Sequence, residues 1–216
     1  MEFNLSNEEI RVLGCLIEKK MATPEYYPLS MNALVNACNQ KSNRDPVVAW
    51  DEDIVYDAIE VLKDKQLVFQ SNLSRVPKYE ESFGAENDLI PSEAAIQCIL
   101  MLRGPQTAGE IRGRTERLYP FENLENVNNT LENLISRDHV MRMARQPGRK
   151  EVRYCHMMGS DEAVSTETDA EIQTQAPEEN SDVVDRITEL EERVESLSSE
   201  LETLKQQFIN FQRQFE

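Results

Sequence analysis

A short polar segment at residues 39–45 carries side chains that could bind a ligand. It reads NQKSNRD and contains three amides and two cations. Lysine and arginine can contact phosphates, and asparagine and glutamine can hydrogen-bond base edges or a peptide backbone. The alternative is structural, because such amides commonly cap helix ends and tie a loop to its own backbone. The candidate contact residues are Asn39, Gln40, Lys41, Asn43 and Arg44.

A second set of basic side chains lies later in the chain. Residues 103–153 hold ten Lys and Arg against seven Asp and Glu. A basic hairpin beside a basic helix would suit contact with phosphates, and the alternative is a solvated charged hairpin. Arg117 and Arg153 belong to these segments. The candidate contact residues here are Arg112, Arg114, Arg142, Arg145, Arg149 and Lys150.

The residue pattern gives little support to catalysis. The two histidines, His139 and His156, lack metal-ligand spacing and have no Cys pair nearby. Neither a P-loop nor a G-x-G-x-x-G motif occurs. We therefore predict that the protein is not an enzyme, with no catalytic residue, no metal site and no cofactor.

The first polar segment lies between two predicted helices of a larger unit. A capping box that begins at Ser6 starts the first helix. Ser30 and Asp51 are suited to cap the second and third helices. Residues 67–69 and 75–79 then read as the strands of a hairpin. The order helix, helix, helix, hairpin predicts a winged helix, with the polar segment as the turn of a helix-turn-helix.

The same layout is repeated further on. Thr107 and Glu110 form a second capping box, at the start of a short basic helix that includes Arg117. Pro147 and Gly148 suit the turn of a second hairpin, between predicted strands at 140–145 and 151–156. We therefore predict an α+β protein, mainly α with small β-hairpins, built from tandem winged-helix domains. The predicted domain boundaries are 1–84 and 88–158.

The predicted third helices bear on what these domains bind. In a DNA-binding winged helix, this element normally enters the major groove. The third helix of the second domain is rich in asparagine and glutamate and is neutral at best. An acidic face would be repelled by phosphates and would suit a protein partner. The third helix of the first domain has such a face outside its apolar stripe, formed by Glu52, Asp53, Asp57, Glu60 and Asp64.

Most of the acidity lies in the C-terminal part of the chain. The formal net charge is -17, and residues 157–216 alone hold 16 Asp and Glu against 4 Lys and Arg. Residues 159–182 lack hydrophobic periodicity and are predicted to form an acidic flexible linker. Residues 183–216 show apolar positions with alternating spacings of four and three, which is typical of a coiled coil. Its seam would contain Ile187, Leu190, Val194, Leu197, Leu201 and Leu204.

This coiled-coil helix predicts a homodimer. The β-branched residues Ile187 and Val194 alternate with Leu190 and Leu197, the arrangement that favours two parallel strands. A single helix in solution would expose the whole apolar stripe. The alternative is that the helix folds back on the preceding domains.

The cysteines and the apolar segments indicate the compartment. The four cysteines are far apart and mostly lie in apolar helical patterns, as expected of buried thiols in a reducing compartment. No apolar run is long enough to span a membrane, and the N-terminus lacks the features of a signal peptide. We therefore expect a cytoplasmic protein without a membrane partner.

Several short motifs are spread over about residues 5–158. They are Thr23-Pro24, Tyr27-Pro28-Leu29-Ser30, Ala37-Cys38-Asn39-Gln40-Lys41-Ser42-Asn43-Arg44, Pro46-Val47, Arg75-Val76, Lys78-Tyr79-Glu80, Leu102-Arg103-Gly104, Gln106-Thr107, Gly109-Glu110, Arg145 and Pro147-Gly148. Together they resemble the YceH-type family of bacterial proteins. The resemblance implies tandem winged-helix domains, and it implies no particular activity, ligand or site residue.

Two functions are compatible with these features. The first is a dimeric nucleic-acid-binding protein, with double-stranded DNA as its partner and a possible role in transcriptional regulation. The second is a protein-protein adaptor that uses winged-helix domains without binding DNA. Charge placement separates them, because the basic hairpin favours DNA and the acidic third helix favours a protein partner.

Overall fold

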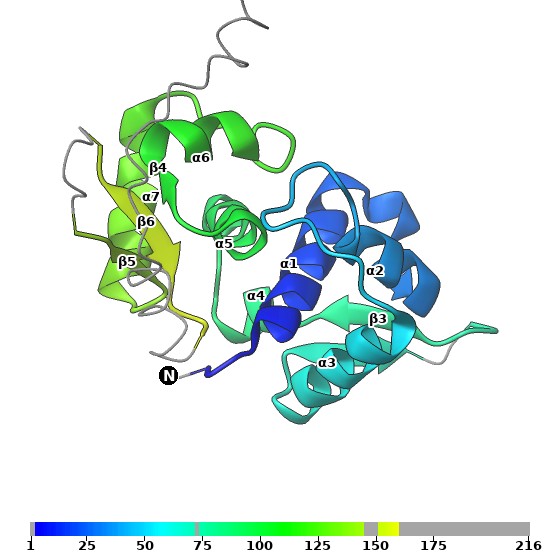
Figure 1. Cartoon of the computed structure of the whole chain (residues 1–216). Coiled ribbons are helices and arrows are strands. Elements are labelled where there is room, and N and C mark those ends of the chain that lie inside the picture. Colours follow the sequence, from blue (N-terminus) through cyan, green and yellow to red (C-terminus); the bar gives the residue numbers. More distant parts are fainter. Residues whose placement is uncertain (1–2, 72–73, 145–150, 160–216) are drawn as a thin grey trace, which may run out of the picture. The chain divides into compact units, whose positions relative to one another are not determined.

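A computed structural model describes residues 3–71, 74–144 and 151–159 of the chain (Figure 1). The described residues form a mixed helix and sheet structure and belong to one compact unit. The first half of this unit, which we call module 1, contains α1 (Asn7–Ala22), the 3-10 helix η1 (Pro24–Tyr26), β1 (Leu29–Ser30), α2 (Met31–Cys38), α3 (Glu52–Asp64), β2 (Val68–Ser71), β3 (Lys78–Glu81) and the short α4 (Phe83–Glu86).

The second half, module 2, has the same order of main elements. In each module, a two-residue strand pairs with the last strand of the hairpin, which gives three-stranded antiparallel sheets of order β1-β3-β2 and β4-β6-β5. Module 2 contains α5 (Pro91–Arg103), β4 (Gln106–Thr107), α6 (Ala108–Thr115), α7 (Leu124–Ser136), β5 (Val140–Arg142) and β6 (Arg153–His156).

The helix caps follow from the sequence. The Ser6 hydroxyl accepts a hydrogen bond from the Glu9 amide at 3.2 Å, which starts α1. The hydroxyl of Thr107 and the carboxylate of Glu110 cap each other's amides at 3.2 and 2.9 Å, as the predicted capping box requires. Asp51 caps α3 through the Ile54 amide. These bonds satisfy amides that a helix start leaves without a backbone partner.

Helices α1 and α5 pack against each other at the junction of the two modules (Figure 1). A β-carbon added at Gly14 would lie 3.0 Å from Leu102 Cδ2 and 3.1 Å from Met101 Cβ, so the two helices approach closely at this glycine. The Cys98 thiol also lies 3.5 Å from the Gly14 carbonyl oxygen. The core of module 1 includes side chains from α5, and the two modules therefore share buried surface.

The start of the chain lies against the end of module 2. The Leu5 amide donates to the Met158 carbonyl at 2.8 Å, and both side chains are buried in the core of module 1. The Phe3 ring lies edge-on to Phe83, with centroids 5.6 Å apart, and stacks on His139 at 6.2 Å. The N-terminal segment thus joins the two modules at a second place.

Some predicted features fall outside the described residues. These are the hairpin cations Arg145, Arg149 and Lys150, the linker at 159–182 from residue 160 onward, and the whole predicted coiled coil at 183–216. All four cysteines are described, and each is a buried thiol outside any disulfide, as predicted for small core residues. Within the described ranges, no helix is both long and apolar enough to cross a bilayer.

Candidate functional site

The polar segment forms a clasp that closes the loop between α2 and α3. The Asn39 side chain makes two hydrogen bonds to the backbone of Trp50, accepting from its amide at 2.8 Å and donating to its carbonyl at 2.7 Å. Arg11 on α1 donates to the Pro46 carbonyl at 2.7 Å, and its guanidinium lies 5.9 Å from the centre of the Trp50 ring. Asn39 is therefore part of the internal structure of the loop.

We expect the Asn39→Ala variant to lose about 1–2 kcal/mol of free energy of unfolding. Alanine leaves the half-buried amide and carbonyl of Trp50 without their partner, which costs more than the net value of two hydrogen bonds. Chemical denaturation monitored by Trp50 fluorescence would measure the change. Asn36→Ala is a matched control, because Asn36 bonds only to an exposed side chain on the same helix. Equal losses in the two variants would show that the hydrogen bonds between Asn39 and Trp50 add nothing to the free energy of unfolding.

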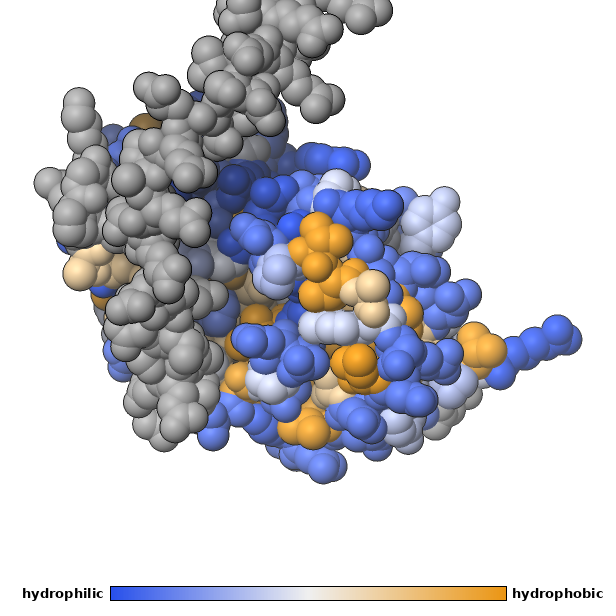
Figure 2. Space-filling model, viewed as in Figure 1, coloured by the Kyte–Doolittle hydropathy of each residue, from blue (hydrophilic) through white to orange (hydrophobic). Residues whose placement is uncertain are grey.

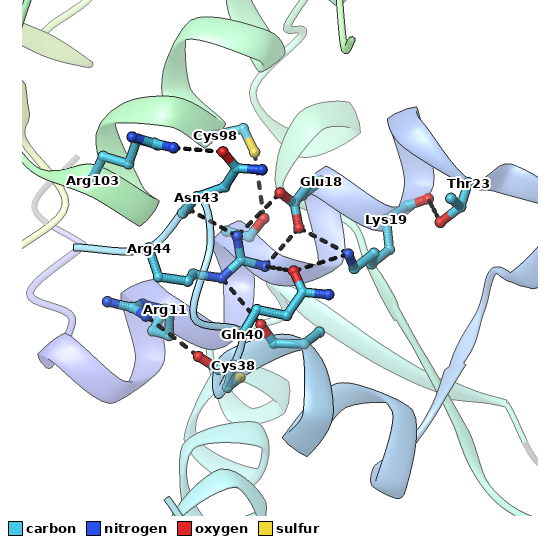
Figure 3. Close-up of polar contacts among 12 residues, drawn as sticks. Arg11, Glu18, Lys19, Thr23, Cys38, Gln40, Asn43, Arg44, Cys98 and Arg103 are labelled. Atoms are coloured by element: carbon cyan, nitrogen blue, oxygen red, sulfur yellow. Dashed lines mark hydrogen bonds and ion pairs between the residues drawn. The ribbon is translucent and has the colours of Figure 1, made fainter. Parts of the chain in front are cut away.

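Arg44 occupies the centre of the clasp and has a fully buried side chain (Figure 3). Its Nη2 lies 2.6 Å from Glu18 Oε2 and 3.2 Å from Gln40 Oε1. Its Nη1 lies 3.1 Å from Glu18 Oε1, so the carboxylate is held in a bidentate arrangement, and its Nε donates to the Ala37 carbonyl at the end of α2. The geometry thus assigns Arg44 to the folding of the loop and leaves it no access to an external partner.

The charges of this pair depend on each other. Burial raises the pKa of Glu18, but hydrogen bonding to Arg44 and the charges of Arg44 and Lys19 outweigh burial and leave that pKa below its usual value. Burial also lowers the pKa of Arg44, and the bond to Glu18 reverses this, so the pKa of Arg44 is raised. Both groups therefore stay charged at neutral pH.

The clasp also reaches module 2. The Asn43 side-chain oxygen accepts from Arg103 Nη2 at 2.5 Å, and the Asp45 amide donates to the Leu102 carbonyl at 2.9 Å. Asn43 adopts a left-handed backbone conformation with φ of 61°, which asparagine tolerates better than most residues. The segment 39–45 is thus fixed between α1, α2 and α5.

Beside the clasp lies a cleft of about 770 Å³ whose walls come from both modules. We call it the module cleft. Gln40, Lys41 and Asn43 line it from module 1, and Arg114 lines it from module 2. These four residues come from the two segments that the sequence singled out separately, and the structure brings them together. Arg117 also lines the cleft, from the turn after α6 instead of from the helix as predicted.

Two other predicted cations of module 2 lie in the described part of the chain, Arg112 and Arg142, and both have internal partners. Arg112 donates to the Glu122 carbonyl at 3.1 Å. Arg142 on β5 pairs with Glu132 on α7 at 2.6 Å, and its guanidinium lies 5.7 Å from the centre of the Tyr154 ring. Both side chains remain exposed, and an exposed pair of this kind contributes little stability. They could therefore exchange these partners for a ligand at low cost.

The third helices of the two modules, α3 and α7, expose different kinds of side chain. Helix α3 turns Asp53, Asp57, Glu60 and Asp64 away from its buried stripe, as predicted, and the apolar Ile54 and Val61 are exposed beside them. Figure 2 shows hydrophobic surface among hydrophilic residues over the middle of the face where α3 and the preceding loop lie in Figure 1. The surface of α7 is instead rich in exposed amides, contributed by Asn126, Asn128, Asn129 and Asn133.

Sequence reasoning missed three residues that shape this region: Glu18, Lys19 and Arg103. They lie at the ends of α1 and α5. Charged residues at the end of a helix are ordinarily expected to be exposed to solvent. One signal was available, because the middles of both helices are almost free of polar residues, and a helix that is apolar all round is buried. Polar residues at the ends of two such helices can be expected to meet the loops that cross them.

Comparison with known proteins identifies the family. A family model described as "Protein of unknown function, DUF480" matches residues 5–149. A UPF0502 protein of Solibacter usitatus is 46% identical over 217 residues and covers 100% of both chains. A UPF0502 protein of Pelobacter propionicus is 54% identical over 164 residues, which is 74% of this chain and 75% of the relative. The chain therefore belongs to the DUF480 family of bacterial UPF0502 proteins, the YceH-type family that its sequence resembles.

Proposed function

We propose that this protein is a tandem winged-helix protein that binds double-stranded DNA through module 2, and that it is not an enzyme. Each module has the order of three helices and a hairpin that a winged helix requires, with an added short strand in the sheet. A role in transcriptional regulation would follow from such binding. The position relevant to DNA reading is the third helix, α3 in module 1 and α7 in module 2.

The observation that carries this proposal is the set of four exposed asparagines on α7. An asparagine amide can donate and accept at once, and it pairs with the major-groove edge of adenine in this way. Two carboxylates, Glu125 and Glu132, are also exposed on α7, and Arg142 pairs with Glu132 at 2.6 Å and offsets its charge, which leaves the charge of Glu125 beside the asparagines. Helix α3 has an acidic stripe at the equivalent place, so module 1 would not read DNA in this manner.

Cations at the edges of α7 would contact the phosphates on either side of the groove. Arg112 on α6 and Arg142 on β5 are exposed within the described region. Arg145, Arg149 and Lys150 lie outside it, in the segment that joins β5 and β6. Together they would supply the salt-dependent part of the affinity.

The test is the affinity of the full-length protein for duplex DNA across a salt series. We expect affinity to fall steeply with salt, and the Arg112→Gln and Arg142→Gln variants each to reduce the salt slope by about one. Arg75→Gln is the matched control, since Arg75 is an exposed cation of module 1 and should leave the affinity unchanged. Absence of binding at low salt, or equal weakening by Arg75→Gln, would refute the proposal.

A specific observation favours protein-adaptor activity as the second candidate. The acidic stripe of α3 and the exposed Ile54 and Val61 beside it would suit a partner with both basic and apolar side chains. The Asp57→Lys variant should lose binding to such a partner, and the Arg142→Gln variant should keep it. A DNA complex should respond in the opposite way, with Arg142→Gln weakening it.

We also propose that residues 183–216 form a parallel coiled-coil homodimer. Two chains joined in this way would present two copies of α7 and raise the affinity of each through effective concentration. Sedimentation of the full chain should show a dimer. Replacing Leu190 and Leu197 together with glutamate should give a monomer, because charges at the seam are not tolerated. A dimer that persists in this variant would place the interface elsewhere.

A further inference from the structure

We propose that the module cleft binds a small phosphate-bearing anion of a non-aromatic kind, such as a sugar phosphate or an inorganic polyphosphate. This inference is independent of DNA reading by α7, because the cleft lies between α1, the loop after α2 and the end of α6. The argument rests on the charges, the hydrogen-bond donors and the dimensions of the cleft.

Three cations of the cleft have no close ion-pair partner among the described residues. Lys41 and Arg117 line it, are exposed, and have no ion-pair partner within 4 Å among the described residues. Arg114 reaches Glu110 only at 3.9 Å. The nearby Arg103 has a lowered pKa, mainly because of burial and then because of repulsion by Arg114 and Arg44, which is consistent with a positive environment. Lys41, Arg114 and Arg117 can therefore turn toward an anion without breaking a strong ion pair.

The amides that line the cleft are fixed as donors. The Gln40 side-chain oxygen accepts from Lys19 at 3.3 Å and from Arg44 at 3.2 Å, and the Asn43 oxygen accepts from Arg103 (Figure 3). Lysine and arginine can only donate, so these bonds determine which amide atom is the oxygen. Each NH2 group is then left to donate elsewhere. The cleft thus presents amide donors beside its cations.

The carboxylates of the cleft do not cancel this charge. Glu18 is held by Arg44 at 2.6 Å and by Lys19 at 3.2 Å, which leaves it neutralised at the floor. Glu116 is the other carboxylate among the lining residues. Its single negative charge is outnumbered by the positive charges of Lys41, Arg114 and Arg117. A ligand with several acceptor oxygens and more than one negative charge fits this balance best.

The size and the lining narrow the class of ligand. A volume of about 770 Å³ falls in the range of small-molecule sites and is too small for a folded partner. None of the described residues that line the cleft is aromatic, and its lining includes the hydroxyl-bearing residues Thr23 and Ser42. Bases bound without pairing usually stack on aromatic rings. We therefore favour a compact phosphate ester or polyphosphate over a nucleotide.

Gly113 on α6 provides a direct way to occlude the cleft. It lines the cleft, and an added β-carbon would meet no atom within 4 Å. A leucine there would extend into the cleft without disturbing the core and without changing the net charge. It should also leave the helix intact, since leucine is a better helix former than glycine.

The test is calorimetric titration of the full-length protein with inorganic pyrophosphate. We expect binding that weakens at least tenfold in Gly113→Leu and in the double variant Lys41→Gln with Arg117→Gln. The matched control replaces Arg75 and Lys78 with glutamine, which removes the same charge from module 1 away from the cleft and should leave the affinity unchanged.

Three results would overturn the proposal. They are an absence of pyrophosphate binding at millimolar concentration, an equal loss in the control variant, and an affinity that Gly113→Leu does not change. A further arm adds duplex DNA. Displacement of pyrophosphate by DNA, with parallel loss of both ligands in the cleft variants, would assign the cleft to the nucleic-acid backbone instead of a small anion. Loss of pyrophosphate binding in Gly113→Leu while DNA binding survives would support the small-anion site.

Discussion

The Gly14→Val variant should lose about 2–3 kcal/mol of free energy of unfolding. Its β-carbon alone would approach Leu102 and Met101 to 3.0–3.1 Å, and two more methyl groups would have to enter the same contact between α1 and α5. Met101 meets the added atom through its own β-carbon, which can move only with the backbone. Overpacking of a close helix contact is costly for this reason. Thermal and denaturant unfolding would measure the loss.

Gly113→Ala is the control for this substitution. It also adds a side chain to a glycine inside a helix, but into open space. Alanine there should stabilise the protein by about 0.5–1 kcal/mol through helix propensity and reduced chain entropy. The two substitutions should therefore act in opposite directions. Similar effects at both positions would mean that α1 and α5 do not pack as tightly as the structure indicates.

The Arg44→Met variant should lose about 3 kcal/mol of free energy of unfolding. Methionine fills a similar volume, but it leaves Glu18 as a largely buried charge with only Lys19 nearby. Removing one partner of a buried pair is expensive because the other charge remains desolvated. It also leaves the Ala37 carbonyl without its side-chain donor. Denaturant unfolding at pH 7 would provide the measurement.

Arg44→Lys separates charge from geometry. Lysine keeps the positive charge but cannot bind both oxygens of Glu18 and the Ala37 carbonyl from one planar group. We expect it to recover only part of the loss. A lysine variant as stable as the natural protein would show that charge alone is sufficient and that the bidentate geometry is unimportant.

The pair should also make stability depend on pH. The pKa of Glu18 is lower in the folded protein than its ordinary value, so the unfolded chain binds a proton more readily at this site. The resulting stabilisation is fully present above the ordinary carboxyl pKa and disappears as the pH falls through the lowered folded value. The difference in stability between the natural protein and Glu18→Gln should therefore shrink in acid. A constant difference from pH 7 to acid would exclude this linkage.

Local signals in the sequence predicted much of the fold. Ser6, Asp51 and Thr107 were identified as caps from side-chain chemistry alone, and each accepts the expected amide. The Glu9 carboxylate does not complete the predicted capping box and instead pairs with Lys65, at the C-terminal end of α3, at 3.3 Å. A partner that is distant in the sequence thus replaced a local one.

The strands were harder to place. The second strand of the first hairpin was expected at 75–79 and lies at Lys78–Glu81, and the strands β1 and β4 were not anticipated. Two residues are too few to show alternation, and the pairing of Leu29 with Tyr79 depends on the folded sheet. The edges of a small sheet are set by tertiary contacts that periodicity does not report.

The candidate site was predicted by residue type but not by role. The segment 39–45 was open to two readings, as a contact surface or as a structural clasp. The structure shows that Asn39 and Arg44 face inward, whereas Lys41 lies on the module cleft. The sequence could not separate these roles, because inward or outward direction depends on Glu18 and Trp50, which lie elsewhere in the chain.

The packing of α1 against α5 has a consequence for the way the protein unfolds. Cys98, Met101 and Leu102 of α5 are buried in the same core as Leu13 and Leu16 of α1. Loss of either module would expose the apolar side of the other, so the two should melt in a single cooperative transition. Although the two halves share one order of elements, we expect them to unfold as one thermodynamic unit. A destabilising substitution in one half should then lower the stability of both.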